Sequence, residues 1–303
     1  MTKSIAKSRL NKFTLFDYVN ILHLLFVGVV TFYPFYNVLL VSLNDPTDSA
    51  MGGVFFYVRK FTLLNYYQFF RDSTLLKASF ISVSRTLLGT FCSVLFTSAF
   101  AYGISKSYLI ARSFIVRFML LTMFISGGLV PYFILIKSVG LYQNFLVYVI
   151  PALFSSYNAI ILMTAFKSIP NELEESVRID GGHDIIIFFR ITIPVSMPVI
   201  ATIALFNAVG QWNAWFDSIL YGGRNLLTLQ AKLVEIITDA NQARELERAG
   251  QNVIAGILRL AYKPTVESIK ATAMMVTAIP IIIVYPFLQK YFVKGIMIGS
   301  LKG

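Results

Sequence analysis

Few side chains in this sequence could do covalent chemistry. There are two histidines, His23 and His183, and one cysteine, Cys92, so no Ser/His/Asp set, HExxH zinc motif or internal disulfide can be proposed. The dipeptide Gly-Lys does not occur, so the usual P-loop for nucleotide phosphates is absent. We therefore expect no catalytic residue, no metal and no cofactor. The chemistry left to this chain is non-covalent binding.

One candidate binding face lies in an apolar stretch, residues 195–216. Asn207, Gln211 and Trp215 stand at i, i+4 and i+8 and would share one face of a helix. Amides and an indole suit a sugar, and polar groups in a membrane span usually line the bundle interior or a water-filled path. Alternatively, these side chains only form hydrogen bonds between helices. Further residues could line the outer mouth of a path or anchor at the interface: Trp212, Asn213 and Asp217.

The second candidate binding region is a short, highly charged segment. Residues 171–191 read NELEESVRIDGGHDIIIFFRI and predict two short amphipathic helices around a Gly181-Gly182 turn. The expected helix signals are an Asn171/Glu174 capping pair, an Asp184 cap and Pro194 as a stop. The first helix is expected to expose Glu172, Glu174, Glu175 and Arg178, with Leu173 and Val177 as an apolar ridge. Such a helix suits docking on another protein; an ordinary interfacial helix is the alternative.

The composition indicates that the polar face and the charged segment belong to a membrane protein. Hydrophobic residues make up 56% of the chain and charged residues 14%, whereas a soluble domain carries about 25% charged residues. A membrane-spanning helix needs about 20 apolar residues, and six stretches qualify: 21–43, 84–104, 114–136, 145–166, 195–216 and 269–288. We therefore expect an all-α membrane protein with six transmembrane helices. The ionisable residues His23, Arg85 and Asp217 fall near span ends, which argues against acid–base or metal chemistry inside the membrane.

Lysine and arginine set the expected orientation. Six spans put both termini on one side, where the segments hold 13 of the 26 basic residues, against 12 on the other side. The first group of segments is short, and short segments dominate the positive-inside rule, so we expect both termini in the cytoplasm. The net charge of +11 arises from basic residues that flank spans, and no aromatic-basic run suggests nucleic acid. The first span is too long for a signal peptide and is expected to be retained.

The charged segment resembles the coupling loop of ABC importer permeases, whose pattern is EAA, then glycine, then proline after a fixed gap. Glu175-Ser176-Val177 occupies the EAA position, Gly181 is the glycine, and Pro194 follows it by 13 residues. Ser176 and Val177 replace the two alanines of the pattern. The resemblance implies that the loop couples the chain to a separate ATPase. The coupling residues that it implies are Glu174, Glu175, Ser176, Val177, Arg178, Asp180, Gly181 and Pro194.

Three further stretches, residues 124–142, 200–215 and 280–303, resemble the sugar-importer branch of these permeases, which is MalG-like. Ser126-Gly127-Gly128 in the first is typical of the LplC/YtcP-like subgroup. The resemblance implies the type I ABC importer permease fold and a transport subunit for a sugar or oligosaccharide, with no nucleotide site and therefore no enzyme activity of its own. The substrate path would include Asn207, Gln211, Trp212 and Trp215. The alternatives are an importer for another solute, such as a peptide or glycerol phosphate, and a secondary carrier or membrane enzyme.

The resemblance also implies partners and a place in the cell. A second, MalF-like permease would complete the path, a cytoplasmic ATPase dimer would drive it, and an extracytoplasmic solute-binding protein would deliver the sugar. The subunit would lie among the lipids of the bacterial cytoplasmic membrane. The expected divisions are a cytoplasmic segment (1–20), the first span with an outer aromatic-rich loop (21–78), the permease core (79–290) with coupling loop 167–194 and outer excursion 221–268, and a cytoplasmic tail (291–303).

Overall fold

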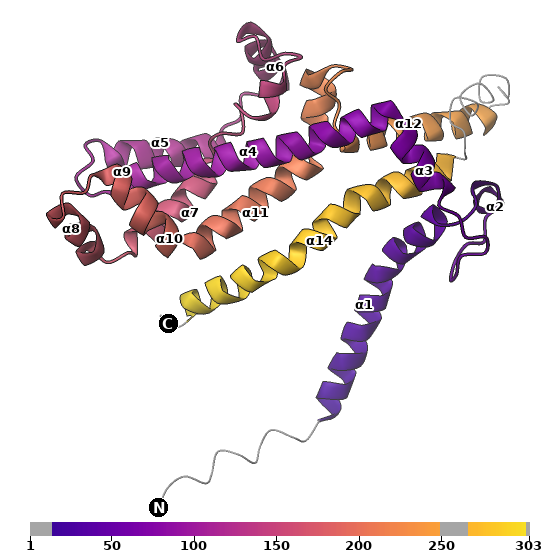
Figure 1. Ribbon diagram of the computed structural model, residues 1–303, viewed down its shortest axis with the longest axis horizontal. Helices are drawn as coiled ribbons and strands as arrows, with labels where there is room; N and C mark the ends of the chain where they lie inside the picture. Colours follow the sequence, from indigo (N-terminus) through magenta and orange to yellow (C-terminus); the bar gives the residue numbers. More distant parts are fainter. Residues whose placement is uncertain (1–13, 249–265, 301–303) are drawn as a thin grey trace, which may run out of the picture.

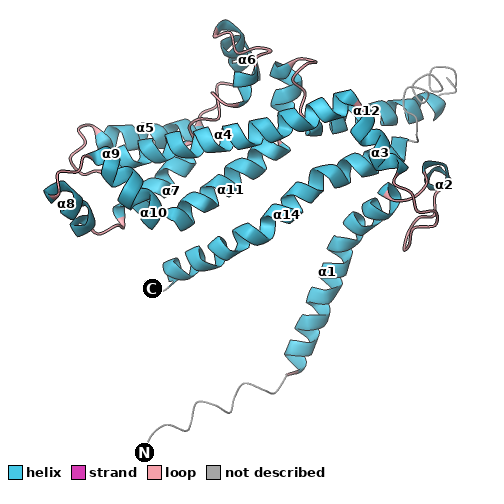
Figure 2. Ribbon diagram, in the orientation of Figure 1, coloured by secondary structure: helices cyan, strands magenta, loops and turns pink. Residues whose placement is uncertain are grey.

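The described residues, 14–248 and 266–300 of a computed structural model, form helices with no β-strand beyond an isolated bridge between Asn44 and Phe61 (Figure 1; Figure 2). The prediction of an all-α protein is confirmed for these residues. The longer helices are α1 (Leu15–Ser42), α3 (Leu64–Arg71), α4 (Ser73–Ser105), α5 (Arg112–Phe124), α6 (Leu129–Ser138), α7 (Ser156–Lys167), α8 (Asn171–Ile179), α11 (Met197–Asn213), α12 (Leu229–Arg248) and α14 (Val266–Ser300). The shorter ones are α2 (Pro46–Ala50), η1 (Phe145–Tyr148), α9 (Asp184–Ile187), η2 (Phe188–Thr192), α10 (Ile193–Val195) and η3 (Ser218–Gly222).

Helix α4 is the central element. Its 33 residues make it about 50 Å long, and it packs against α7 and α11 and, toward its start, against α3 and α12. Asp72 begins the helix by accepting hydrogen bonds from the backbone N–H groups of Thr74 and Leu75. Helix α14 runs beside α11, and Figure 1 shows α4, α11 and α14 in one layer.

The largest core cluster lies where α4, α7 and α11 meet the short helices of the charged segment. Its buried side chains include Tyr102, Leu162, Met163, Ile187, Phe188 and Ile203. Apolar burial at this end therefore connects the charged segment to the long helices.

Helix α1 is the exception to this packing. Figure 1 shows it diverging from the other long helices, and it contacts α14. Only 6% of its most apolar 18-residue window is buried, against 39% for α4. An apolar helix this exposed in one chain requires lipid or another protein around it.

The membrane spans are less regular than the six predicted stretches. By length and composition, α1 and α4 can each cross a membrane, and up to four described spans result if each of two bent helix pairs counts as one. Predicted span 114–136 divides into α5 and α6, which meet at 117°. The break falls at Ser126-Gly127-Gly128, where Gly128 has a φ of +82° that a continuous helix cannot contain.

Two other predicted spans also differ from a single continuous helix. In 145–166, the short 3-10 helix η1 comes first and α-helix begins only at Ser156, so α7 is about 18 Å long, short of a 30 Å hydrocarbon core. In 195–216, α11 ends at Asn213 and begins after a bend of 83° from the preceding helices. The predicted span 269–288 lies within α14, which continues to Ser300 and so makes most of the predicted tail helical.

Candidate functional site

The charged loop, residues 171–194, forms one end of the molecule, opposite α2 and α3 (Figure 1). Its predicted Gly-Gly turn is confirmed. Gly181 has a φ of +82°, which L side chains rarely adopt. A Cβ on Gly182 would collide with the side chain of Val177 and lie 2.9 Å from its carbonyl oxygen. The turn therefore requires glycine at both positions, for two different reasons.

The predicted helix caps of this loop are wrong. Pro170 is the N-cap of α8, and Asn171 is its first helical residue. His183 is the N-cap of α9, and neither N-cap makes a side-chain capping bond. Asp184 instead accepts hydrogen bonds from Arg178 Nη2 at 2.5 Å and from the Tyr108 hydroxyl at 3.1 Å. Its carboxylate therefore connects the two helices of the loop to the segment after α4.

Helix α8 is attached to the end of α4 by charge. Lys106 Nζ forms an ion pair with Glu174 and lies 4.1 Å from the centre of the Tyr102 ring. The pKa of Arg178 is raised, first by its hydrogen bond with Tyr108 and then by the charge of Asp184. Val177 packs against the core cluster below. Three of the predicted coupling residues, Glu174, Val177 and Arg178, therefore hold α8 in place.

The outward surface of α8 is different from the predicted ridge. Leu173 is exposed as predicted, but Val177 faces the protein, and the second exposed apolar side chain is Ile179, 85% exposed. Glu172 is also exposed, as are six predicted coupling residues: Glu175, Ser176, Arg178, Asp180, Gly181 and Pro194. Sequence reasoning missed Ile179, whose only signal was an apolar side chain directly before the Asp-Gly-Gly turn.

A hollow of about 550 Å³ opens between α8 and the ends of α4, α5 and α7. Its charged lining includes Lys106, Arg112, Lys167, Glu175 and Arg178. This polar hollow therefore lies directly beside the exposed helix α8.

A second polar site lies deep between the long helices, around Arg85. The guanidinium donates to Asp217 from Nη2 at 2.7 Å and from Nη1 at 3.1 Å, and to Gln211 Oε1 from Nε and Nη2 at 3.0 Å each. Nη1 also donates to the carbonyl of Ala214 at 3.3 Å, and the Tyr148 ring centre lies 4.4 Å from the guanidinium carbon. All five donors are used, so this buried charge is compensated and binds α4 to the end of α11.

The predicted polar face of α11 is divided by this network. Gln211 is buried and donates to the carbonyl of Tyr148 at 3.2 Å, besides accepting from Arg85, which matches the alternative of hydrogen bonds between helices. Trp212 is buried and donates to the carbonyl of Thr277 in α14 at 3.0 Å. Trp215 lies beyond the end of α11 and is 41% exposed. The Asn207 amide nitrogen is buried without a partner among the described residues.

A cavity of about 180 Å³ adjoins the arginine network. It is lined by Arg85, Tyr132, Tyr148, Gln211, Asp217 and Tyr221, together with apolar side chains. Tyr132 and Tyr221 contact each other edge to face with ring centres 5.9 Å apart. Aromatic faces beside polar edges are what a sugar ring requires. No group of three or more His, Cys, Asp or Glu in the described parts of the chain could hold a metal ion.

Known proteins resemble this chain in sequence and in fold. Residues 80–298 match the family described as binding-protein-dependent transport system inner membrane component. The chain is 35% identical to protein LplC of Bacillus subtilis over 95% of both chains. It is 34% identical to the polygalacturonan/rhamnogalacturonan transport system permease protein YtcP of the same organism, over 95% of this chain and 99% of that one.

More distant relatives agree. The arabinooligosaccharides transport system permease protein AraQ of Halalkalibacterium halodurans is 23% identical over 92% of this chain and 94% of its own. Among solved structures, a subunit of a bacterial ABC transporter that imports the acidic polysaccharide alginate superposes with a TM-score of 0.82 at 26% identity, covering 93% of this chain and all of that one. The likeness thus covers the whole fold and not the charged loop alone.

Proposed function

Because this chain belongs to the binding-protein-dependent transport system inner membrane component family, we propose that it is the permease subunit of an ATP-driven importer for a sugar or oligosaccharide. The family match over residues 80–298 carries this conclusion. Relatives named for polygalacturonan/rhamnogalacturonan and arabinooligosaccharide transport support the substrate class, as does the fold shared with the alginate importer. The chain moves a solute and does not transform it, and partner subunits hydrolyse the ATP.

The exposed helix α8 is the part that meets the ATPase. Its outward side combines Glu175 with the apolar side chains Leu173 and Ile179, which together suit a groove on a partner. The Lys106–Glu174 ion pair attaches α8 to α4. A movement of the ATPase against α8 would therefore pass to α4 as a rigid-body displacement.

The predicted coupling residues have two different roles in this mechanism. Glu175, Ser176 and Asp180 are exposed and contact the ATPase directly. Five others keep α8 at the correct angle: Glu174, Val177, Arg178, Gly181 and Pro194.

The substrate path runs along α11. Asn207 carries a buried amide nitrogen without a partner among the described residues, and Trp215 presents a half-exposed indole near the arginine network. These two side chains are the ones that contact sugar. Gln211 and Trp212 position α11 instead, because their polar atoms already bind neighbouring helices.

A second permease subunit completes the path. The exposure of α1, whose most apolar 18-residue window is only 6% buried, supports such a partner. The arrangement has six membrane passages, with α5–α6 and η1–α7 as irregular ones, and with both termini and the charged loop in the cytoplasm. The binding protein docks at the opposite end, where α2, α3 and the start of α4 lie.

Reconstitution tests this function. The chain is produced with its partner permease and ATPase, purified as one complex, and placed in liposomes that enclose ATP, with the binding protein and a labelled oligosaccharide outside. Uptake should require ATP, all subunits and the binding protein. Uptake driven by an ion gradient without ATP, or uptake of a peptide in preference to any sugar, would assign a different transporter class or substrate.

A further inference from the structure

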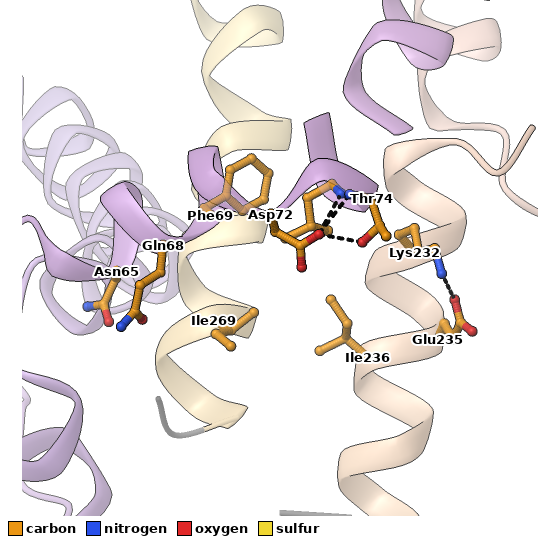
Figure 3. Close-up of a pocket in the computed structure, with 10 residues that line it drawn as sticks. Asn65, Gln68, Phe69, Asp72, Thr74, Lys232, Glu235, Ile236 and Ile269 are labelled. Carbon is orange, nitrogen blue, oxygen red and sulfur yellow. Dashed lines mark hydrogen bonds and ion pairs between the residues drawn. The ribbon is translucent and has the colours of Figure 1, made fainter. Parts of the chain in front are cut away.

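A small cavity lies at the outer end of the molecule, where α3, the start of α4, α12 and α14 meet (Figure 3). Its volume is about 150 Å³, and its lining includes Asn65, Gln68, Asp72, Glu235, Ile236 and Ile269. We call it the acceptor pocket, because its polar lining consists mainly of hydrogen-bond acceptors. The 33 residues of α4 separate it from the charged loop by about 50 Å.

Asn65 sets the character of this pocket. The residue is 1% exposed, and its Nδ2 donates to the carbonyl oxygens of Ser42 and Asn44 at 2.9 Å each. Because those carbonyls can only accept, the amide cannot flip, and Oδ1 is fixed on the other side. Oδ1 is buried and has no partner among the described residues. A buried acceptor without a donor costs free energy, so Oδ1 favours a donor group that enters the cavity.

Two further acceptors belong to the same cavity. Gln68 Oε1 is also buried without a partner among the described residues. Asp72 uses Oδ1 for three bonds at the start of α4, from Thr74 N, Thr74 Oγ1 and Leu75 N, and no described contact reaches its Oδ2. Figure 3 shows Gln68 beside Asn65, and Asp72 above Ile269. An occupant must therefore bring several donors at once.

The charges of the lining favour a cation. The one basic side chain of the lining, Lys232, is paired with Glu235 at 2.6 Å, so Asp72 has no ion pair among the described residues. A calcium ion prefers six to eight oxygen ligands and several carboxylates, and the described residues contain no group of three that could hold a metal. An ammonium or guanidinium group supplies both a positive charge and three or more donors in a space of this size.

We propose that the acceptor pocket receives a lysine or arginine side chain of the extracytoplasmic solute-binding protein when that protein docks. This rests on the proposed function, which requires such a protein at this end of the molecule. The chain has a net charge of +11, which as a whole disfavours the approach of a basic group, and an acceptor pocket gives one an isolated point of attachment. The contact fixes the register of the docked protein, as desolvated charged hydrogen bonds do at interfaces.

Charge substitutions at Gln68 test the proposal in both directions. The side chain of Gln68 makes no described hydrogen bond, so replacing it removes none. In the complete importer in nanodiscs, ATP hydrolysis is measured against the concentration of the binding protein that stimulates the unmodified complex. Gln68→Lys fills the pocket with an ammonium group and should raise the half-stimulating concentration about tenfold or more. Gln68→Glu should lower that concentration, and hydrolysis without binding protein should stay unchanged for both.

Two further variants separate the pocket from general effects. Gln242→Lys makes the same charge change on the exposed surface of α12, ten residues and about 15 Å beyond Lys232, and should leave the half-stimulating concentration within twofold. Asp72→Asn keeps an oxygen that can cap α4 while removing the charge, and should weaken stimulation several-fold even if Gln68→Lys fails to fold.

The possible outcomes are distinct. Equal shifts for Gln68→Lys and Gln242→Lys, or no shift for Gln68→Lys and Asp72→Asn in assembled complexes, would overturn the proposal and leave water as the occupant. An opposite sign for Gln68→Glu would overturn it too. If no binding protein stimulates the unmodified complex, the proposed function itself fails, a result that the Gln68 variants cannot produce.

Discussion

At the scale of single residues, Arg85 shows what spacing alone cannot reveal. An isolated arginine near the end of an apolar stretch is expected to reach water, yet its side chain is 3% exposed. Its partners Gln211 and Asp217 lie 126 and 132 residues away along the chain. Nothing in the local pattern joins them, so the sequence left Gln211 between a sugar path and a hydrogen bond to another helix, and Asp217 between the outer mouth of a path and an interfacial anchor.

The Arg85 network leads to a prediction about stability. Asp217→Ala would leave a buried guanidinium without its carboxylate, and breaking a buried pair in this way typically costs about 3–5 kcal/mol. Asp217 is 34% exposed, so we expect a cost at or below the low end of that range. This loss of stability is measured by heating the purified complex and monitoring its unfolding by size-exclusion chromatography. The double variant Arg85→Met with Asp217→Leu removes both charges and should be more stable than Asp217→Ala alone. The reverse order would mean that the network is not a compensated pair.

The α11 face gives a second prediction, with different outcomes for two residues. Gln211→Leu removes an acceptor from Arg85 and should lower assembly or stability by about 1–3 kcal/mol, with normal uptake per assembled complex. Trp215→Ala removes a half-exposed ring and should lower sugar uptake several-fold, with normal assembly. Quantifying assembled complex alongside ATP-dependent uptake distinguishes the two. Reduced uptake per complex for Gln211→Leu would return that residue to the substrate path.

At the scale of elements, hydrophobic stretches predicted where the chain is apolar but not where helices break. The stretches that became α1, α4 and α14 are continuous. The helices α4 and α14 extend beyond both predicted ends, and α1 begins earlier than predicted. The stretch interrupted by Ser126-Gly127-Gly128 became two helices. Hydropathy measures transfer into lipid and is insensitive to one residue with positive φ, which bends the chain at little cost in apolar surface. The Gly-Gly turn was predictable because two adjacent glycines between amphipathic segments typically form a turn.

The charged loop yields a third prediction. Glu175→Lys reverses a charge on the exposed surface of α8, and Gly181→Val places a β-branched side chain at a φ of +82°. Both variants should reach the membrane at normal amounts yet lose most binding-protein-stimulated ATP hydrolysis. The subunit content of purified complexes and the hydrolysis rate measure these effects. Glu245→Lys makes the same charge change on exposed α12 and should be silent. Full stimulation in both loop variants would show that α8 does not contact the ATPase.

At the scale of the whole molecule, the two ends carry different surfaces. One end has the charged loop, with its exposed α8 and polar hollow, and the other has α2, α3 and the acceptor pocket. Composition and span number predicted a membrane protein with two such ends. They could not predict the divergence of α1, because an exposed apolar helix and a buried one have the same sequence pattern. A surface of that kind acquires its partner only in the assembled importer.

The orientation of the two ends gives the last prediction, tested by cysteine labelling in intact cells in a Cys92→Ala background. Asp48 is held by Asn44 and Arg59, so the exposed neighbour Thr47 is the better outer position. A membrane-impermeant maleimide should label Thr47→Cys and Gln242→Cys, and should label His183→Cys only after the membrane is permeabilised. The physical reason is the concentration of lysine and arginine in the short segments on the side of the charged loop. ATP-dependent uptake by each variant, measured in the same cells, ensures that the labelled protein is assembled. Labelling of position 183 but not 47 and 242 in intact cells would invert the orientation, and with it the ends assigned to the ATPase and to the binding protein.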